Sequence, residues 1–271
     1  MDYRPVITLT TDFGLADEFV ASMKGVILSI APETSIVDIS HLVAHGNIKE
    51  GAFLLQRTYP FFPAGTIHCV VIDPGVGTDR HILATKSTGQ VFVAPDNGLL
   101  SPILRDTDRL EAIHAVTNRS LFNTRVSNTF HGRDIMAPVA AHLAAGLNIK
   151  EVGDQLTCGD CVIVPQIKSK IQSSRLIGEI IHIDRFGNIC TNITLSELAN
   201  LSPTHDIIVH VGSYSISGMT KSYGHVGDGE LLAHFDSHDH LEISVSGGSA
   251  ALLTGSRPGS IVTVEQRKSH H

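Results

Sequence analysis

The first 160 residues alternate between short apolar runs typical of strands and longer stretches with helical periodicity. Helices are expected at Phe19–Ile30, Ile48–Thr58 and Gly132–Ala145, the last with apolar residues at four-residue spacing. The strand-like runs are Val6–Thr10, Ser35–Ile39, Thr66–Ile72, Ile82–Thr85, Val91–Ala94 and Ala112–Val116. Strands that alternate with helices predict a largely parallel sheet flanked by helices on both faces.

From about residue 176 the pattern changes to short alternating runs separated by Gly, Ser and Asp. These runs are Ile177–Ile183, Ile189–Ile193, Ile207–Val211, Glu230–His234, Leu241–Val245 and Ser260–Val264. Such spacing is typical of a small antiparallel barrel or sandwich. The polar stretch Pro165–Ser174 separates the two patterns. The sequence therefore predicts an α/β N-terminal domain over residues 1–165 and an all-β, barrel-like C-terminal domain over residues 175–271.

Composition narrows the classes of function. The chain has 271 residues, is 42% hydrophobic and carries a formal net charge of −7 without a run of Lys or Arg. This charge disfavours a nucleic-acid or anionic-membrane partner, because both need a concentrated positive field. No apolar stretch approaches the roughly 20 residues that span a bilayer, and the first residues lack the pattern of a secretion signal. A soluble, cytoplasmic protein is the expectation.

The four cysteines are too few for a disulfide scaffold. Cys69 and Cys190 lie in strand-like runs and are expected to be buried thiols. Cys158 and Cys161 form a C-x2-C pair, but no second pair follows at zinc spacing. A pair of loop thiols is therefore favoured over a metal or redox site.

Acidic residues follow several predicted strands. Asp12 follows VITLTT, Asp73 follows TIHCVVI and Asp38 follows SIV. Ligands of open α/β sheets bind beyond the carboxyl ends of the strands, although an acidic residue there is also a common start of a turn. Gly14 and Gly75 each stand two residues after an aspartate, so the backbone can approach a ligand closely. The lysine of a phosphate-binding loop is absent, which disfavours a nucleotide site of that kind.

His131 stands at the start of the helix predicted at Gly132–Ala145. The positive end of a helix disfavours a charged imidazole, and a neutral histidine could accept a proton or orient a water molecule. A capping or packing role is the alternative, since the chain has 16 histidines. Asp73, Arg80 and His131 together could hold and deprotonate a water molecule without a metal.

Eight segments in order along the chain form a recognisable set: TTDFG at 10–14, SIVDISH at 35–41, EGAFLL at 50–55, FFPAGTIH at 61–68, IDPGVGTDR at 72–80, APDNGLL at 94–100, TFHGRDIMAPVAAHLAAG at 129–146 and IDRFGNICTNI at 183–193. Together they resemble the adenosine-forming S-adenosyl-L-methionine (SAM) hydrolases. That family is also called the SAM hydroxide adenosyltransferases and is related to the SAM-dependent fluorinases and chlorinases.

The resemblance implies that SAM and water give adenosine and L-methionine, with SAM as the substrate and no cofactor. It also implies a homotrimer whose active sites lie between one subunit's N-terminal domain and its neighbour's C-terminal domain. The implied site residues are Asp73, Arg80 and His131 for the water, Asp12 for the ribose, Asp184 for the methionine amino group, Asn188 for adenine, Phe186 and Tyr223 beside adenine, and Ser237 for the methionine carboxylate. Either Asp73 or His131 could accept the proton of the water.

The chain departs from the family pattern at two places. Asp236 and His238 flank Ser237 where the family usually has a segment like NS-(aromatic or Arg)-G-Y-L-E-I, which alters the corner expected to bind the methionine carboxylate. Gly46 stands where an aromatic residue is common, so one wall of the ligand pocket is expected to be thinner or filled from elsewhere. A purely structural interpretation of IDRFGN is a β-turn between two strands, and such a turn is compatible with a ligand site.

The sequence leaves three alternatives open. His234, His238 and His240 would share one side of a continuous strand and could bind a metal, but a turn at Ser237–Asp239 is favoured and would break that geometry. A SAM-dependent halogenase would attack the same C5′ atom, although a carboxylate at Asp73 repels a halide. A sensor that binds SAM or adenosine with negligible turnover is the third, and the intact set of Asp73, Arg80 and His131 disfavours it.

Overall fold

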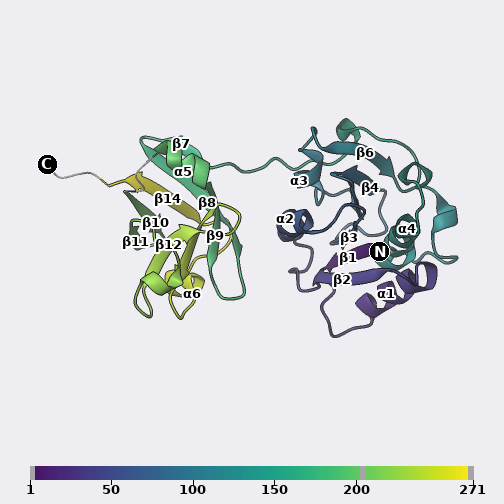
Figure 1. The fold of residues 1–271 in the computed structure, drawn as a ribbon, viewed down its shortest axis with the longest axis horizontal. Coiled ribbons are helices and arrows are strands. Elements are labelled where there is room, and N and C mark those ends of the chain that lie inside the picture. The colour runs from purple at the N-terminus through teal and green to yellow at the C-terminus, as the bar shows by residue number, and fades with distance from the viewer. Residues whose placement is uncertain (1–3, 202–205, 268–271) are drawn as a thin grey trace. The chain divides into compact units, whose positions relative to one another are not determined.

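The computed structural model describes residues 4–201 and 206–267. The chain divides into two compact units, residues 1–165 and residues 166–271 (Figure 1). None of the helices in the described part of the chain has the length and apolar character needed to cross a bilayer.

The first unit is built on a six-stranded sheet with the strand order β2-β1-β3-β5-β4-β6. Strands β2, β1, β3 and β5 run parallel to one another, whereas β4 is antiparallel to both β5 and β6. The strands are β1 (Val6–Thr11), β2 (Ser35–Ser40), β3 (Ile67–Val71), β4 (Ile82–Ser87), β5 (Gln90–Pro95) and β6 (Leu110–Ala115). This arrangement confirms the predicted α/β unit with a largely parallel sheet.

Helices cover both faces of this sheet (Figure 1). On one face, α1 (Phe19–Ile30) and α4 (Ala137–Ala144) pack with Met23, Ile27 and Val139 against the buried side chains of β1 and β3. On the other face, α2 (Ile48–Thr58) and the short α3 (Ser101–Leu104) pack with Leu55 and Ile103 against the opposite side of the sheet. Burial on both faces explains why β3 and β5 are mostly apolar and buried at every position, without the alternation of a half-exposed strand.

The second unit is an eight-stranded antiparallel sheet with the order β11-β10-β14-β8-β9-β13-β12, and β7 pairs with β8. The Thr220 N–H donates to the Ala233 carbonyl at 2.9 Å, which joins the segment after β11 to β12 and nearly closes a barrel. The elements are β7 (Lys170–Gln172), β8 (Arg175–Ile183), β9 (Ile189–Thr194), α5 (Leu195–Leu201), β10 (Ile207–Val211), β11 (Tyr214–Ser217), β12 (Leu231–Phe235), β13 (His240–Val245), α6 (Ala250–Thr254) and β14 (Ile261–Gln266). The predicted barrel-like all-β class is confirmed.

The sequence pattern missed several short elements. Strand β7 lies inside the polar stretch that was expected to separate the two units. All three of its residues are exposed, so the sequence shows no buried positions that would mark a strand. The turn into β8 places Ser173 and Ser174 at φ of 50° and 60°. The short helices α3, α5 and α6 span too few residues for a helical period to show.

A neutral histidine is built into the core of the first unit. His68 lies on β3 with Nδ1 2.8 Å from the Thr8 hydroxyl and Nε2 3.1 Å from the Gln90 side-chain oxygen. Its ring stacks on Phe92 with centroids 4.9 Å apart. Burial lowers the pKa of His68 to about 4, although the hydrogen bond to Gln90 acts in the opposite direction. The charged form is therefore excluded from the folded state near neutral pH.

We expect this histidine to make folding sensitive to mild acid. The unfolded chain binds the proton near pH 6.5 and the folded chain only near 4, so the free energy of unfolding should fall by about 3 kcal/mol as pH drops through that window. Urea unfolding of wild type and His68→Gln at pH 7.5 and 4.5 measures the difference. A His142→Gln variant, altered at a half-buried site on α4, serves as the control. An equal pH dependence in all three proteins would refute the assignment.

Candidate functional site

The predicted N-terminal site residues lie at one edge of the parallel sheet. Asp12 directly follows β1, and Asp73 lies two residues beyond the end of β3. Strands β1 and β3 are parallel neighbours, with Thr11 paired to Val71 at their ends. The two aspartates therefore emerge at the same carboxyl edge, where α/β sheets bind ligands. Asp38 does not share this position, because it lies within β2.

Asp73, Arg80 and His131 meet in one cluster. The Arg80 Nε donates to both carboxylate oxygens of Asp73, at 2.8 and 3.0 Å, and an Nη of the same guanidinium also donates to Asp73. That nitrogen lies 3.1 Å from Nδ1 of His131. The side chains of Asp73 and Arg80 are only 5% and 11% exposed. The ion pair is therefore shielded from water, which strengthens it and holds its geometry.

Two glycines allow these segments to approach each other. A Cβ at Gly77, where φ is +81°, would lie 2.5 Å from the Asn128 carbonyl oxygen, so only glycine fits against that loop. A Cβ at Gly132 would lie 3.1 Å from a Val71 methyl group and 3.5 Å from the Phe13 ring. The first glycine brings the Asp73–Arg80 loop against the loop that precedes His131. The second brings the helix start against the end of β3.

The helix that follows His131 begins irregularly. The structure has a π-helical turn over Gly132–Met136 and then α4, where the sequence predicts one regular helix over Gly132–Ala145. Pro138 has no N–H for the carbonyl of Asp134, and that carbonyl instead accepts from the Asn123 N–H at 2.9 Å. Such π-helical turns often occur at functional sites.

Asp134, in the π-helical turn, binds the loop that precedes His131. Its buried carboxylate accepts from the Arg133 Nε at 2.7 Å and from the Ser127 N–H at 2.8 Å. Burial alone would raise the pKa of Asp134, but these hydrogen bonds outweigh it and lower the pKa to about 2. The carboxylate therefore stays ionised, and the loop that ends at His131 is fixed at neutral pH.

The imidazole of His131 is neutral near physiological pH. Partial burial lowers its pKa below the ordinary value, and the positive charge of Arg80 lowers it further, whereas Asp73 and Asp134 act in the opposite direction. A guanidinium can only donate, so the contact with Arg80 marks Nδ1 as an acceptor and assigns the ring proton to Nε2. Nε2 is thus the donor nitrogen of the ring, and a hydrogen bond with the Ser127 backbone also acts to raise the pKa of His131.

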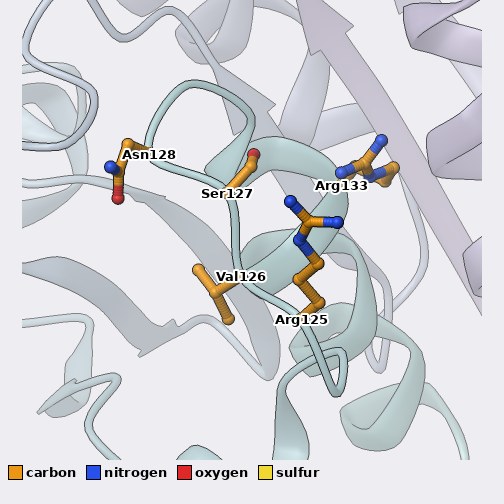
Figure 2. Close-up of a pocket in the computed structure, with 5 residues that line it drawn as sticks. All are labelled: Arg125, Val126, Ser127, Asn128 and Arg133. Carbon is orange, nitrogen blue, oxygen red and sulfur yellow. The ribbon is translucent and has the colours of Figure 1, made fainter.

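A cavity of about 430 Å³ lies along the same loop, lined by Arg125, Val126, Ser127, Asn128 and Arg133. Figure 2 shows Arg125 and Ser127 on one stretch of this loop and Arg133 on the helical turn that follows. The Arg133 guanidinium is already bound to Asp134 and lies 4.8 Å from the centre of the Phe130 ring. Sequence reasoning did not identify this cavity, because loop arginines carry no periodic signal.

The side chain of Asp12 is buried, and one of its two carboxylate oxygens already has partners. Its side chain is 6% exposed, and Oδ2 accepts from the Gly46 N–H at 2.8 Å and lies 3.4 Å from Nδ1 of His45. Oδ1 accepts no hydrogen bond from the residues that the structure describes. Gly46, one of the predicted departures, thus supports Asp12 with its backbone, and its φ of +67° suits glycine. The position leaves one carboxylate oxygen for a ligand.

In the second unit, Asp184 and Asn188 bind each other in the turn between β8 and β9. The Asp184 carboxylate accepts from the N–H groups of Phe186 and Asn188 and from the Asn188 side-chain amide, each at 2.9 Å. The turn interpretation of IDRFGN is thus confirmed, and any ligand must share this carboxylate with the turn. Phe186 projects from the turn with 78% of its surface exposed.

Tyr223 belongs to a polar network that sequence reasoning missed. Its hydroxyl donates to Glu242 at 2.9 Å, and Nε2 of His234 lies 3.1 Å from the same oxygen. Burial, with Glu242 as the next contribution, raises the pKa of Tyr223 to about 12. Burial lowers the pKa of His234, but the hydrogen bond and charge of Glu242 outweigh it and the net pKa is raised. The Tyr223 hydroxyl and the His234 imidazole therefore both contact the same carboxylate oxygen of Glu242.

Ser237 lies in the turn between β12 and β13, where its hydroxyl is 3.1 Å from Nδ1 of His238. Asp236 shapes this turn by accepting from the N–H groups of His238 and His240, and Asp239 has φ of 60°. The predicted turn at Ser237–Asp239 is thus present, and the Asp236 departure has a structural role.

The histidines considered as metal ligands have separate partners. His234 faces Glu242, His238 faces Ser237, and Nδ1 of His240 contacts the Thr191 carbonyl at 2.8 Å. Within residues 4–201 and 206–267, no three His, Cys, Asp or Glu side chains gather in a metal-binding group. None of the four cysteines, all of which lie in the described part of the chain, forms a disulfide bond, and Cys69 and Cys190 are buried as predicted. Burial, with Asp96 next, raises the pKa of Cys161 to about 11, which opposes thiolate reactivity.

The comparisons with known proteins cover both units. The family model for the SAM hydroxide adenosyltransferase N-terminal domain matches residues 7–153, and the model for the C-terminal domain matches residues 178–263. An (R)-S-adenosyl-L-methionine hydrolase of Salinispora tropica is 37% identical, over 94% of this chain and 95% of that protein. A fluorinase of Nocardia brasiliensis is 26% identical, over 97% of each chain.

Among solved structures, an uncharacterised conserved protein of Thermotoga maritima is similar, with 37% identity and a TM-score of 0.89 over 96% of this chain and all of that one. The two family models together account for most of the sequence, and the hydrolase relative extends over nearly all of it. The chain therefore belongs to the SAM hydroxide adenosyltransferase family.

Proposed function

We propose that this protein hydrolyses SAM to adenosine and L-methionine by attack of water on the ribose C5′. The observation that carries the proposal is the buried cluster of Asp73, Arg80 and His131 beside Asp12 at the carboxyl edge of the sheet. Relatives at 32% to 37% identity that are named (R)-S-adenosyl-L-methionine hydrolase support it.

Activation of the nucleophile is the main requirement of this reaction. The sulfonium sulfur leaves as a neutral thioether, so no acid is needed at the leaving group. Water is a weak nucleophile, but its protons become strongly acidic as its oxygen bonds to C5′ and takes on positive charge. A carboxylate is basic enough to accept that proton, and we assign this role to Asp73. The bonds from Arg80 hold the carboxylate in one orientation, so it is placed in advance of the reaction.

His131 then acts through its other nitrogen. With Nδ1 facing Arg80, the N–H at Nε2 can donate a hydrogen bond to the attacking oxygen and so direct a lone pair of that oxygen toward C5′, without transfer of the proton. The negative charge of Asp73 is neutralised by the proton and the positive charge of the sulfonium is lost as the C5′–S bond breaks, so a site shielded from water favours the reaction. Nothing in this scheme needs a metal or a cofactor, and we propose that SAM is the only small molecule required.

The remaining residues are proposed to bind SAM. Asp12 would accept the ribose hydroxyls, Asp184 would bind the methionine amino group and Asn188 would bind adenine. Phe186 and Tyr223 would flank adenine, and Ser237 would hold the methionine carboxylate. We further propose a homotrimer with active sites at the subunit interfaces, which the resemblance to the family implies.

A SAM-dependent halogenase is the second candidate, supported by fluorinase relatives at 26% and 32% identity. The position of Asp73 speaks against it, because a halide bound near the attack site would meet a carboxylate instead of donors alone. A sensor without turnover would not need the shielded ion pair, whose burial has a desolvation cost.

An assay in water enriched in heavy oxygen tests the proposal. The purified protein should convert SAM to adenosine that carries the heavy isotope at its 5′ oxygen, with or without chloride or fluoride present. The rate should be the same in a chelator and after addition of divalent metal ions. Mass spectrometry of the nucleoside product and of methionine gives the readout.

Each other outcome identifies a different protein. A 5′-halogenated nucleoside would establish the halogenase, and SAM that binds but remains intact would establish the sensor. Adenosine without the isotope would show that water is not the nucleophile. Loss of activity in the chelator would overturn the metal-free scheme.

A further inference from the structure

His41 is a buried histidine that the proposed reaction does not use. It follows β2 in the segment SIVDISH, is 3% exposed and lies beside the loop that carries Asp12. Its Nδ1 is 2.9 Å from the hydroxyl of Thr11, the last residue of β1. Its Nε2 lies 3.1 Å from Oδ1 of Asp38. The other oxygen of Asp38 accepts from Lys24 Nζ on α1 at 2.6 Å.

A register shift between β1 and β2 makes this contact feasible. Leu9 pairs with Asp38, but Thr10 pairs with Ser40, so β2 has one extra residue at this point. The next step of that register brings His41 opposite Thr11. Bulges of this kind redirect side chains near ligand sites, and without the extra residue Ser40 would lie opposite Thr11.

Nε2 of His41 makes no hydrogen bond with the described residues, although Oδ1 of Asp38 lies 3.1 Å away, so Asp38 acts on this nitrogen by its charge. The negative charge favours the tautomer with its proton on Nε2, which leaves Nδ1 to accept a hydrogen bond from the Thr11 hydroxyl. The Thr11 oxygen in turn accepts from the N–H of Phe13 at 3.3 Å. The carbonyl of His41 accepts from the N–H of Gly14 at 2.7 Å. Both residues that follow Asp12 are thus bound to His41, one through Thr11 and one directly.

We propose that Lys24, Asp38, His41 and Thr11 form a positioning relay that fixes the loop of Asp12 and thereby sets its affinity for the ribose. The relay spans α1, β2 and β1, so it connects the loop to the rigid part of the first unit. The Gly46 N–H then needs only to orient the side chain of Asp12. The proposal rests on the proposed role of Asp12 as the ribose ligand.

Removal of one hydroxyl tests the relay. Thr11→Val keeps the shape but leaves the Phe13 N–H and His41 Nδ1 without this partner, so KM for SAM should rise about tenfold while kcat changes by less than about threefold. Thr11→Ser keeps a hydroxyl and should restore KM. Thr10→Val is the matched control, because the neighbouring Thr10 hydroxyl is buried with no hydrogen-bond partner among the described residues. A Thr11→Val protein with unchanged KM, or an equal effect of Thr10→Val, would overturn the relay.

The two nitrogens of His41 can be tested separately. His41→Asn places an acceptor near the Nδ1 position and should retain more affinity than His41→Gln, which reaches toward Asp38 instead. Calorimetric binding of adenosine and of 2′,3′-dideoxyadenosine to Asp12→Asn and to Thr11→Val then distinguishes the two levels of the proposal. If Asp12→Asn leaves the preference for adenosine intact, the ribose role of Asp12 fails. If only Thr11→Val leaves it intact, the relay alone fails.

Discussion

Replacing Asp73 with asparagine is expected to lower kcat for SAM hydrolysis by about 10²- to 10⁴-fold, the range for loss of a general base. Asparagine has the same shape but cannot accept the proton as the C5′–O bond forms. The Kd for SAM should change by less than about threefold, because the proposed role of Asp73 is to contact the nucleophile and not the nucleoside. His131→Ala should act in the same direction. Single-turnover kinetics together with equilibrium binding separates the two quantities.

The surface offers a matched control for this change. Asp106 pairs with Arg109 at 3.6 Å in an exposed turn. Asp106→Asn therefore removes the same charge from an aspartate–arginine pair that is not part of the proposed site. It should leave kcat unchanged. Thermal unfolding of both variants shows whether the fold is intact. An Asp73→Asn protein that is folded and loses kcat and SAM affinity in equal proportion would remove Asp73 from the catalytic role.

The convergence of Asp73, Arg80 and His131 was predictable because it follows from topology. Acidic residues after neighbouring parallel strands must emerge at one edge, and a helix that packs on those strands must begin there. The irregular helix start also had a signal, since Pro138 inside the predicted helix removes a hydrogen-bond donor. These features depend on residue type and strand order, both of which the sequence displays.

The relay through His41 and the network around Glu242 were not predictable. The segment SIVDISH alternates regularly, and nothing in its pattern shows the extra residue that brings His41 opposite Thr11. Glu242 lies between Leu241 and Ile243 and is expected to face outward on a strand. It does lie on the other face from them, but Tyr223 from an irregular loop covers that face. The path of such a loop depends on tertiary packing that periodicity does not encode.

The same limit applies to Asp184. The segment IDRFGN fits a turn and a ligand site equally well, and the structure shows the carboxylate accepting three hydrogen bonds within the turn. A turn held in this way presents Phe186 and Asn188 in a fixed arrangement. The residue types alone could not show that the carboxylate organises the turn as well as offering a charge.

We expect replacement of Arg80 with methionine to lower both the free energy of unfolding and the catalytic activity. The side chains of Arg80 and Asp73 are 11% and 5% exposed, so Asp73 would be left as a buried, unpaired carboxylate. Removing one partner of a buried ion pair typically costs about 3–5 kcal/mol of the free energy of unfolding. Arg109→Met, in the exposed pair, should cost less than about 1 kcal/mol. Urea unfolding at pH 7.5 measures both.

The same substitution should also move the pH dependence of the reaction. The charge of Arg80 is one cause that lowers the pKa of His131, so its removal should raise that pKa. If the reaction requires neutral His131, activity falls as pH drops through this pKa. The acid limb of the kcat/KM profile should therefore lie below pH 6.5 in wild type and shift to higher pH in Arg80→Met. Arg80→Lys keeps the charge and should shift the limb less, although it loses the forked contact with Asp73. An acid limb at the same pH in all three proteins would show that His131 does not titrate in the reaction, and the arrangement of donor and acceptor proposed for its ring would then be wrong.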